Sequence, residues 1–293
     1  MLKTKIFPEW LKRPLPLTSL DSMNKLLRSR SINTVCRSAR CPNIGECFNQ
    51  RQATFMILGN VCTRDCRFCA IKSGRPCMPD EHEPKEIAAV VSQLSLKYVV
   101  ITSVTRDDLE DGGSSQFAKT IKAVKELKQD IKVEVLAPDF SGNDSAIETV
   151  LAAHPDVFAH NIETVPRLYR TVRPQADYRL SLSVLKKAKK MSDIFLKSSI
   201  ILGLGETEKE AIKTMQDLRD TGCNFLTIGQ YLQPSPESVS VYEFIKPEKF
   251  NYYKEIALNI GFEAVTSGPF VRSSYKASQM YEYAKEALYG VKT

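Results

Sequence analysis

TFMILGNVCTRDCRFCA, residues 54–70, is the stretch from which the fold can be worked out. The apolar run Phe55 to Leu58 has the length of a buried strand and ends at the turn signal Gly59-Asn60. Three cysteines follow in the loop after that strand, with three and then two residues between them: Cys62, Cys66 and Cys69. Three thiolates this close together can hold three corners of an iron-sulfur cube whose fourth iron stays open for chemistry.

Two other kinds of metal site compete with the open cluster. A structural zinc ion takes four ligands, usually from paired cysteines, and a closed electron-transfer cluster also needs a fourth thiolate. The nearest fourth candidate is Cys77, which lies behind Gly74-Arg75-Pro76. This spacing favours the open cluster, with zinc and a closed cluster as the alternatives.

The composition is that of a globular protein of 293 residues, of which 43% are hydrophobic and 26% charged. No run reaches the roughly 18 apolar residues of a membrane helix, and the first thirty residues lack the apolar core of a signal peptide. Seven of the eight cysteines lie between Cys36 and Cys77, which is typical of metal chemistry in a reducing compartment. We therefore expect a cytoplasmic protein.

The net charge is concentrated at one end of the sequence. Residues 1–50 hold nine lysines and arginines against three acidic residues, an excess of six out of the total net charge of +7. Such a segment either meets an acidic partner or is simply a solvated basic surface. No aromatic-basic ribbon and no recognition-helix pattern accompanies it, so we expect neither nucleic acid nor a membrane as partner.

One-sided helices alternate with continuous apolar strands, which is typical of a parallel α/β architecture. Besides Phe55 to Leu58, the expected strands are residues 98–102, 131–136, 157–162, 195–202 and 225–228. Polar residues follow several strand ends, where barrel active sites collect. An open doubly wound sheet and a barrel both fit this pattern. Because six units fall short of eight, we expect a partial (β/α)6 TIM-type barrel with extensions that close over its mouth.

Three segments follow from this pattern. Residues 1–50 form an N-terminal extension with a second cysteine triplet, residues 51–232 the barrel, and residues 233–293 a C-terminal extension. The second triplet has four and then five residues between its members, Cys36, Cys41 and Cys47.

The CxxxCxxC loop after the first strand resembles the signature of the radical S-adenosylmethionine superfamily, in which Phe68 fills the aromatic position before the last cysteine. The resemblance implies that the open iron is chelated by the amino and carboxylate groups of S-adenosylmethionine. It also implies that one electron cleaves the sulfonium to methionine and a 5′-deoxyadenosyl radical. Iron as Lewis acid and template, inside a barrel that shields a radical from water, fits this chemistry.

The second triplet, together with Arg272-Ser273-Ser274-Tyr275, resembles the lipoyl synthases. The likeness covers nearly the whole chain and includes CPNIGEC at 41–47, HNIETV at 160–165, VRPQADY at 172–178 and LGLGET at 202–207. It implies an auxiliary 4Fe-4S cluster on Cys36, Cys41 and Cys47, with the oxygen of Ser274, or failing that Ser273, on the fourth iron. A serine oxygen is a harder ligand than a thiolate, which suits a cluster that is meant to be taken apart.

The same resemblance implies the reaction. Two sulfur atoms from the auxiliary cluster enter at carbons 6 and 8 of an octanoyl group on a lysine of a carrier protein, and two molecules of S-adenosylmethionine are consumed per product. The implied partners are octanoylated lipoyl domains, namely 2-oxoacid dehydrogenase E2 subunits and the glycine cleavage H protein, and an external reductant. The alternatives are another radical sulfur-inserting or methylthiolating enzyme and, outside enzymes, an iron-sulfur electron carrier.

Further candidates for binding S-adenosylmethionine lie at strand ends. Asn161 and Glu163 alternate and point the same way, although they also fit a charged strand terminus. Lys197 either meets the methionine carboxylate or pairs with a barrel acid such as Glu134. The remaining candidates are Gly203 and Gly205, which either admit the adenosine or form a plain left-handed turn, and Arg173. We interpret Cys77 and Cys223 as structural or incidental.

Overall fold

The computed structural model describes residues 7–12, 17–128 and 130–290. Its main sheet has the order β1-β2-β5-β6-β7-β8-β9-β10, in which only β1 runs antiparallel to its neighbour. The strands are β1 (Asn33–Thr34), β2 (Thr54–Ile57), β5 (Tyr98–Ser103), β6 (Lys132–Leu136), β7 (Val157–Ala159), β8 (Phe195–Leu202), β9 (Phe225–Gln230) and β10 (Ala264–Gly268). A separate pair comprises β3 (Val61–Cys62) and β4 (Lys72–Ser73). Because β1 and β10 do not pair, the barrel is open on one side.

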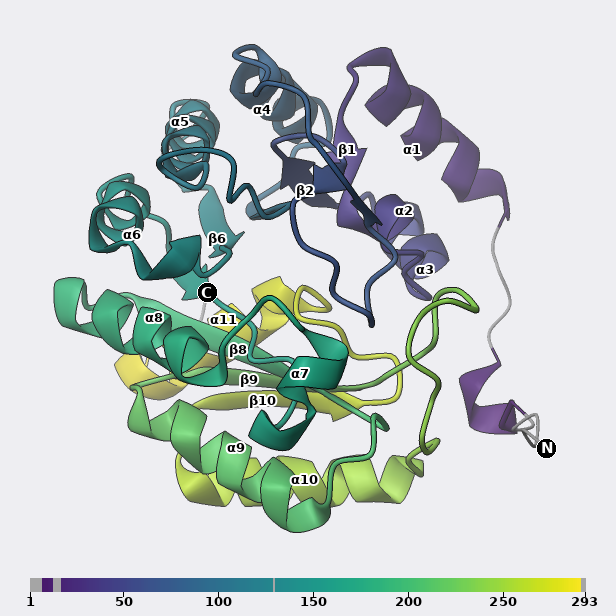
Figure 1. Ribbon diagram of the computed structural model, residues 1–293. Helices are drawn as coiled ribbons and strands as arrows, with labels where there is room; N and C mark the ends of the chain where they lie inside the picture. Colours follow the sequence, from purple (N-terminus) through teal and green to yellow (C-terminus); the bar gives the residue numbers. More distant parts are fainter. Residues whose placement is uncertain (1–6, 13–16, 129, 291–293) are drawn as a thin grey trace.

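Helices surround the curved sheet (Figure 1). They are α1 (Leu17–Ser29), α2 (Val35–Ser38), α3 (Ile44–Asn49), α4 (Glu83–Gln93), α5 (Ser114–Lys125), α6 (Asp144–Leu151), α7 (Tyr169–Val172), α8 (Tyr178–Met191), α9 (Glu208–Asp220), α10 (Pro247–Ile260) and α11 (Ala277–Tyr289). Three short 3-10 turns, η1 (Glu9–Leu11), η2 (Phe140–Gly142) and η3 (Pro166–Leu168), complete the described elements. The alternation of strand and helix from β2 to β10 confirms the predicted partial barrel of parallel α/β type.

Local signals explain where these elements begin. Pro84 occupies the first turn of α4, where its missing N–H costs no hydrogen bond. Thr207 and Glu210 form a capping box at the start of α9. The apolar face of α4, including Ile87 and Val91, is fully buried against the sheet, and each such side chain contributes about 1.5–3 kcal/mol.

The predicted strands are all present, and the structure adds β10 to the parallel barrel, besides the two-residue strands β1, β3 and β4. Within 157–162 the ladder ends at Ala159, after which Glu163 makes only an isolated bridge to Ile200. β10 lies in the segment predicted as a C-terminal extension, where it pairs with β9 along its whole length. The barrel therefore has seven parallel strands, and the segment after residue 232 contributes one of them.

The chain after β10 turns back along the inside of the barrel. Val271 donates its backbone N–H to Gly268 and lies so close to Gly229 that a β-carbon there would be 2.1 Å from the Val271 carbonyl. Farther on, Ser274 reaches Thr54, the first residue of β2. This segment thus runs from the carboxyl end of the strands to their amino end.

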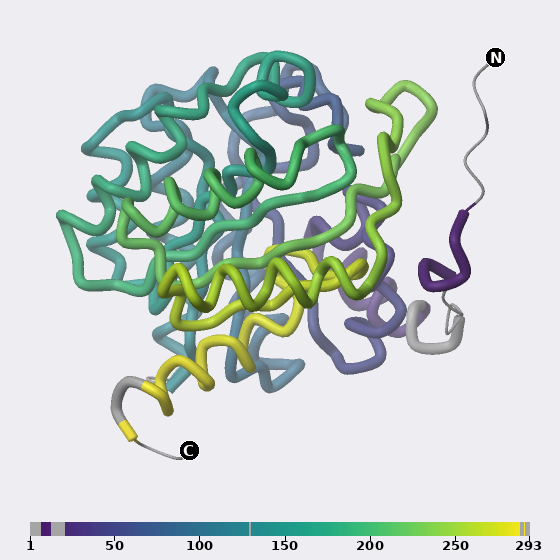
Figure 2. Tube along the Cα trace, turned by 90° about the horizontal axis from the view of Figure 1, so that it is seen from below, coloured from purple at the N-terminus to yellow at the C-terminus, as the bar shows by residue number. Residues whose placement is uncertain are grey.

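Helix α11 closes the amino end of the barrel. Its Met280, Tyr281 and Ala284 pack against first residues of strands, among them Val157, Phe225 and Ala264. Figure 1 shows α11 behind the strands, and in Figure 2 the same helix, in yellow, lies at the lower end of the molecule. The two extensions meet as predicted, but they do not meet over the mouth of the barrel, where the sequence placed them. They meet at Thr54 in the open side of the barrel, and α11 covers the end opposite the mouth.

Candidate active site with two cysteine triplets on one cavity

Both cysteine triplets line one cavity of about 800 Å³ inside the barrel. Cys62, Cys66 and Cys69 reach it from the loop after β2 at the carboxyl end of the strands. The second triplet reaches it from α2, α3 and the turn between them, at the open side. The C-terminal segment adds Arg272, Ser273 and Ser274. Segments far apart in sequence thus supply one chamber.

The loop after β2 is held by backbone hydrogen bonds. The Sγ of Cys62 accepts the N–H of Arg64 at 3.4 Å and that of Thr105 at 3.3 Å, and the Sγ of Cys69 accepts the N–H of Ile71 at 3.4 Å. Arg67 donates its N–H to the carbonyl of Val172 at 2.9 Å. These hydrogen bonds therefore orient the side chains of Cys62 and Cys69 without a bound metal.

Burial raises the proton affinity of two thiols in this loop, those of Cys66 and Cys69. Burial, reinforced by the neighbouring Cys66 and Cys62, raises the pKa of Cys69 to about 12. Burial also raises the pKa of Cys66, against the opposing charge of Arg173. Thiols in such a pocket remain protonated at neutral pH and lose their protons when a metal binds, which couples metal binding to proton release.

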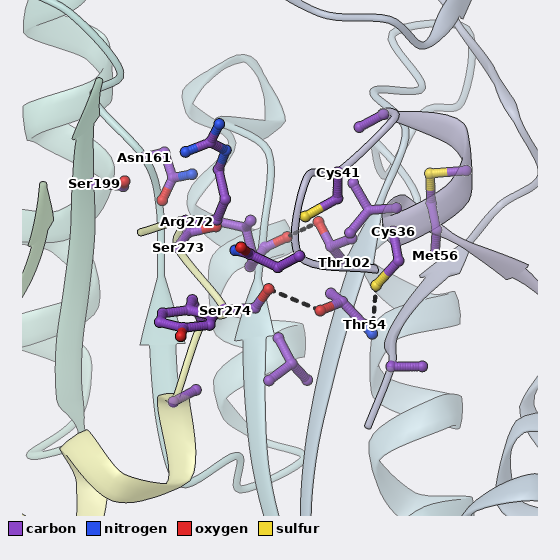
Figure 3. A pocket seen from close by; sticks show the side chains of 18 of the residues that line it. Cys36, Cys41, Thr54, Met56, Thr102, Asn161, Ser199, Arg272, Ser273 and Ser274 are labelled. Carbon is purple, nitrogen blue, oxygen red and sulfur yellow. Dashed lines mark hydrogen bonds between the residues drawn. The ribbon is translucent and has the colours of Figure 1, made fainter. Parts of the chain in front are cut away.

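Cys36 of the second triplet lies beside Thr54, the first residue of β2 (Figure 3). The backbone N–H of Thr54 points to the Sγ of Cys36 at 3.5 Å, while the Thr54 hydroxyl donates to the Oγ of Ser274 at 2.8 Å. Burial raises the pKa of Cys36 to about 11, and the nearby Cys41 adds to this shift. Thr54 therefore brings a cysteine of the N-terminal extension and a serine of the C-terminal segment to one place.

Additional bonds tie the two extensions together. Asn43 donates its amide to the carbonyl of Phe270 at 2.6 Å, and the hydroxyl of Tyr275 donates to Glu46 at 2.9 Å. Both Ser273 and Ser274 line the cavity, and only for Ser274 does the structure give a side-chain bond to the wall beside Cys36. This geometry agrees with the choice of Ser274, which stays a prediction.

Two buried arginines and one carboxylate lie between the triplets. Arg173 faces Cys66 and Arg272 faces Cys41, and both act electrostatically on Glu163. Burial raises the pKa of Glu163, although the two arginines oppose the shift. The guanidinium of Arg173 is fixed by the carbonyl of Asn161 and the hydroxyl of Tyr169, both at 3.1 Å.

Several polar atoms on the cavity wall are buried without a hydrogen-bond partner. They are the hydroxyl of Ser103, Nε2 of His160, Oδ1 of Asn161 and Nε of Arg173. Buried polar atoms usually have partners, so a cluster of unpaired ones marks a place for a polar ligand. Since both donors and acceptors are present near the first triplet, the wall fits a zwitterionic nucleoside derivative such as S-adenosylmethionine.

Lys197 does not face this cavity. Its ammonium bonds to both oxygens of Glu134, at 2.8 and 3.0 Å, and both side chains are 1% exposed. Lys197 is the third residue of β8, near the end of the barrel that α11 covers. Glu134, the alternative partner named from the sequence, is therefore the partner of Lys197. The prediction that Lys197 binds the methionine carboxylate is wrong.

Gly203 and Gly205 also lie outside the cavity wall. Both have left-handed backbones, with φ of 96° and 107°, and the N–H of Gly203 donates to Glu206 at 2.6 Å. A β-carbon on Gly203 would lie 2.2 Å from Nε2 of Gln230. These glycines form a left-handed turn, which was the alternative named from the sequence, and their contact with the adenosine stays a prediction.

The structure also places the remaining residues named from the sequence. Phe68 lines the cavity and packs on the small cluster of Val165, Leu168 and Val172. Cys77 is exposed and Cys223 is buried, and neither lines the large cavity. Sequence reasoning missed Thr54, His160 and Arg64. For Arg64 a signal existed, since it is a charged residue between two cysteines of the loop.

The comparisons with known proteins agree with this site. Residues 56–218 match the profile of the radical SAM superfamily. The chain is 56% identical over 271 residues to the lipoyl synthase of Caldanaerobacter subterraneus subsp. tengcongensis, covering 92% of this chain and 95% of that protein. It is 54% identical to the lipoyl synthase of Caldicellulosiruptor saccharolyticus, covering 95% and 98%. The chain belongs to the lipoyl synthase family.

This membership confirms the resemblance and the enzyme class predicted from the sequence, a radical SAM sulfurtransferase. It implies a 4Fe-4S cluster and S-adenosylmethionine as cofactors. Among solved structures, methylornithine synthase (PylB) matches with a TM-score of 0.56 at 15% identity, covering 87% of this chain and 83% of that one. At this identity the likeness supports the fold alone, and that fold is the predicted partial barrel.

Two features are absent from the residues that the structure describes. No helix within 7–12, 17–128 and 130–290 is long and apolar enough to cross a membrane. In the same residues no three histidine, cysteine, aspartate or glutamate side chains converge on one metal ion. The thiols of a four-iron cluster lie farther apart than the ligands of one ion, because each thiol binds a different iron.

Proposed function

We propose that this enzyme replaces a hydrogen by sulfur at carbons 6 and 8 of an octanoyl group amide-linked to a lysine of a carrier protein. The observation that carries the proposal is the meeting of both cysteine triplets and Ser274 on one cavity. A radical-forming site and a sulfur store must reach the same carbon chain, and a shared chamber satisfies that requirement. The membership in the lipoyl synthase family supports it.

The two triplets take different roles in this proposal. Cys62, Cys66 and Cys69 hold one 4Fe-4S cluster, and Cys36, Cys41 and Cys47 with Ser274 hold the auxiliary one. When bound, the cluster on Cys62, Cys66 and Cys69 would supply the electron that cleaves S-adenosylmethionine, of which two molecules are consumed per product. The auxiliary cluster would supply the sulfur. The spacing of each triplet and its place on the cavity wall support this division.

The chain's own residues bind and orient the small cofactor. Arg173, with its Nε unpaired and directed at the cavity wall, suits a carboxylate. The amide of Asn161 donates to Glu163 at 2.9 Å, which leaves its carbonyl oxygen to accept from a hydroxyl or amine. Phe68 shields this end of the cavity with an apolar surface. Together these groups would hold S-adenosylmethionine on the cavity wall near the first triplet.

The neutral imidazole of His160 adds a hydrogen-bond acceptor. Its Nδ1 lies 2.9 Å from the carbonyl of Ala137, so the proton sits on Nδ1 and Nε2 is left as an acceptor on the cavity wall. Burial, with help from the charge of Arg173, lowers the pKa of His160 to about 4. His160 therefore stays neutral at physiological pH.

Octanoylated lipoyl domains are the proposed partners, with an external electron donor and a cytoplasmic location. Lipoyl domains are generally acidic, and the basic residues of 1–50 supply the complementary charge. Arg28 is exposed on α1, whereas Arg30 is paired with Glu86 at 2.9 Å. Arg28 therefore contributes more than Arg30 to the electrostatic attraction of the carrier. A carrier reaction whose salt dependence is unchanged in Arg28→Glu would remove this part of the proposal.

The decisive experiment uses protein reconstituted with iron and sulfide under exclusion of oxygen. Reductant, S-adenosylmethionine and an octanoyl-lysyl peptide are added, and the products are read by mass spectrometry. Cys36→Ala should keep the formation of 5′-deoxyadenosine and lose sulfur insertion, whereas Cys62→Ala should lose both. Ser274→Ala should behave as Cys36→Ala, with Ser273→Ala as its matched control.

Three outcomes contradict parts of this proposal. Absence of both 5′-deoxyadenosine and sulfur-containing product from the unaltered protein would reject it. Deoxyadenosine without sulfur insertion would leave only a radical enzyme of another specificity. Equal losses in the Cys36 and Cys62 variants would mean that the roles of the triplets are misassigned.

A further inference from the structure

Arg64 stands between Cys62 and Cys66, and its side chain is 9% exposed. Its guanidinium is fully bonded by two carboxylates. Asp107 accepts from Nε at 2.8 Å and from Nη2 at 2.7 Å. Asp139 accepts from Nη1 at 2.6 Å and from Nη2 at 2.8 Å. Paired bonds of this kind fix a guanidinium in position and orientation.

The two carboxylates come from the barrel wall. Asp107 follows β5 and Asp139 follows β6, so Arg64 ties the cysteine loop to two neighbouring strand ends. Thr63 adds to this connection, since its N–H donates to the carbonyl of Thr105 and its hydroxyl donates to Asp107, both within 3.1 Å. We call this set, Thr63, Arg64, Asp107 and Asp139, the loop clamp.

The loop clamp controls the hydrogen bonds that reach the Sγ of Cys62. That sulfur accepts the N–H of Arg64 itself and the N–H of Thr105, at 3.4 and 3.3 Å. Thr105 lies two residues before Asp107. Both donors are therefore held in place by the same salt bridges. Hydrogen bonds to the sulfur ligands are one of the means by which a protein sets the potential of an iron-sulfur cluster.

We propose that Arg64 is a positioning residue that sets the reduction potential of the cluster bound by Cys62, Cys66 and Cys69. It acts through the N–H groups of Arg64 and Thr105 on the Cys62 sulfur. The inference rests on the cluster assigned to these cysteines under the proposed function. Loosening the clamp withdraws N–H donors from the thiolate, which disfavours the added electron and shifts the potential to more negative values.

The test compares three full-length variants with the unaltered protein. Arg64→Lys keeps the charge but cannot bond to both carboxylates in parallel, and Asp139→Asn weakens one of the two bridges while keeping its shape. Arg106→Lys is the matched control. Arg106 is also buried and bonds Asp108 through two nitrogens at 2.8 Å and the carbonyl of Leu58 at 3.4 Å, but it has no hydrogen bond to Asp107 or Asp139.

The measurements are iron content, melting temperature and a potentiometric titration followed by electron paramagnetic resonance, with and without S-adenosylmethionine. The signal that changes on adding S-adenosylmethionine reports this cluster and separates it from the auxiliary one. We expect a negative shift of its midpoint in Arg64→Lys, a smaller negative shift in Asp139→Asn and none in Arg106→Lys. Loss of half the iron with an unchanged melting temperature in Arg64→Lys also supports the clamp.

Two results overturn the inference. One is an unshifted midpoint in both clamp variants at full iron content. The other is an equal change in all three variants, with lowered melting temperatures, which would reduce the clamp to general stability. Failure of the proposed function looks different, because the signal sensitive to S-adenosylmethionine would then be absent from the unaltered protein or would persist in Cys62→Ala.

Discussion

The buried pair of Lys197 and Glu134 offers a prediction that separates a structural role from a catalytic one. Lys197→Met keeps the length of the side chain and removes the ammonium. The carboxylate of Glu134, 1% exposed, then keeps only the hydroxyl of Tyr98 at 2.8 Å. Breaking a buried ion pair by removing one partner costs about 3–5 kcal/mol. We expect a loss of that size in the free energy of unfolding.

Compensating changes test the cause. Lys197→Met/Glu134→Leu removes the stranded carboxylate and should recover most of the loss, because an apolar pair of similar volume is often as stable as an ion pair. The hydroxyl of Tyr98 is then left without its acceptor, which costs about 1–3 kcal/mol, so adding Tyr98→Phe should recover more.

The assay is urea unfolding under exclusion of oxygen, combined with equilibrium dialysis of S-adenosylmethionine. The variants altered only at Lys197 and Glu134 that load their iron should bind S-adenosylmethionine with unchanged affinity, since neither residue lines the cavity; the variant with Tyr98→Phe serves the unfolding measurement alone, because Tyr98 does line it. A Lys197→Met protein of full stability that binds S-adenosylmethionine tenfold more weakly would refute this reasoning and return Lys197 to the cofactor site.

Three further predictions use other contacts. The pKa of His160 is about 4 in the folded protein, against an ordinary 6.5, so the unfolded chain takes up this proton first as the pH falls. The contribution of His160 to the free energy of unfolding in urea should therefore fall by about 3 kcal/mol from pH 7 to pH 4. His160→Gln should remove that contribution and make the pH dependence less steep. Gly203→Ala should lower the melting temperature, at a cost above about 1 kcal/mol, because its φ is 96° and Nε2 of Gln230 stands in the way. Thr54→Val should slow sulfur insertion by about 2- to 10-fold, the equivalent of one hydrogen bond to Ser274, with deoxyadenosine formation unchanged.

The sequence predicts the features that depend on near neighbours. The apolar run Phe195 to Leu202 is a local pattern, and its strand appears where it was expected. The capping box at Thr207 is equally local, because its two residues are three positions apart. β10, with the sequence AVTSG, carries only two strongly apolar residues, so nothing local distinguishes it from a loop. Its identity as a strand comes from pairing with β9.

The sequence does not single out partners that are distant along the chain. It offered Glu134, 63 positions from Lys197, only as one of two alternatives, and it offered no partner for Arg64, which meets Asp139 across 75 positions. Many carboxylates lie at comparable distances, so only the fold selects among them. The glycines at 203 and 205 show the same ambiguity, since a left-handed turn and a nucleotide contact require the same residue type.

The return of the chain through the barrel has a consequence for the order of assembly during synthesis. All six cysteines of the two triplets leave the ribosome long before Ser274, and α11 emerges after it. Until the residues after 268 are made, the chamber lacks the walls that Arg272, Ser273, Ser274 and α11 supply. Only when residues 269–289 thread inward and α11 covers the base does the chamber acquire its final walls. Iron and sulfide can therefore be delivered to this protein before its fold is complete. A change that delays the packing of α11 would lengthen the time available for that delivery.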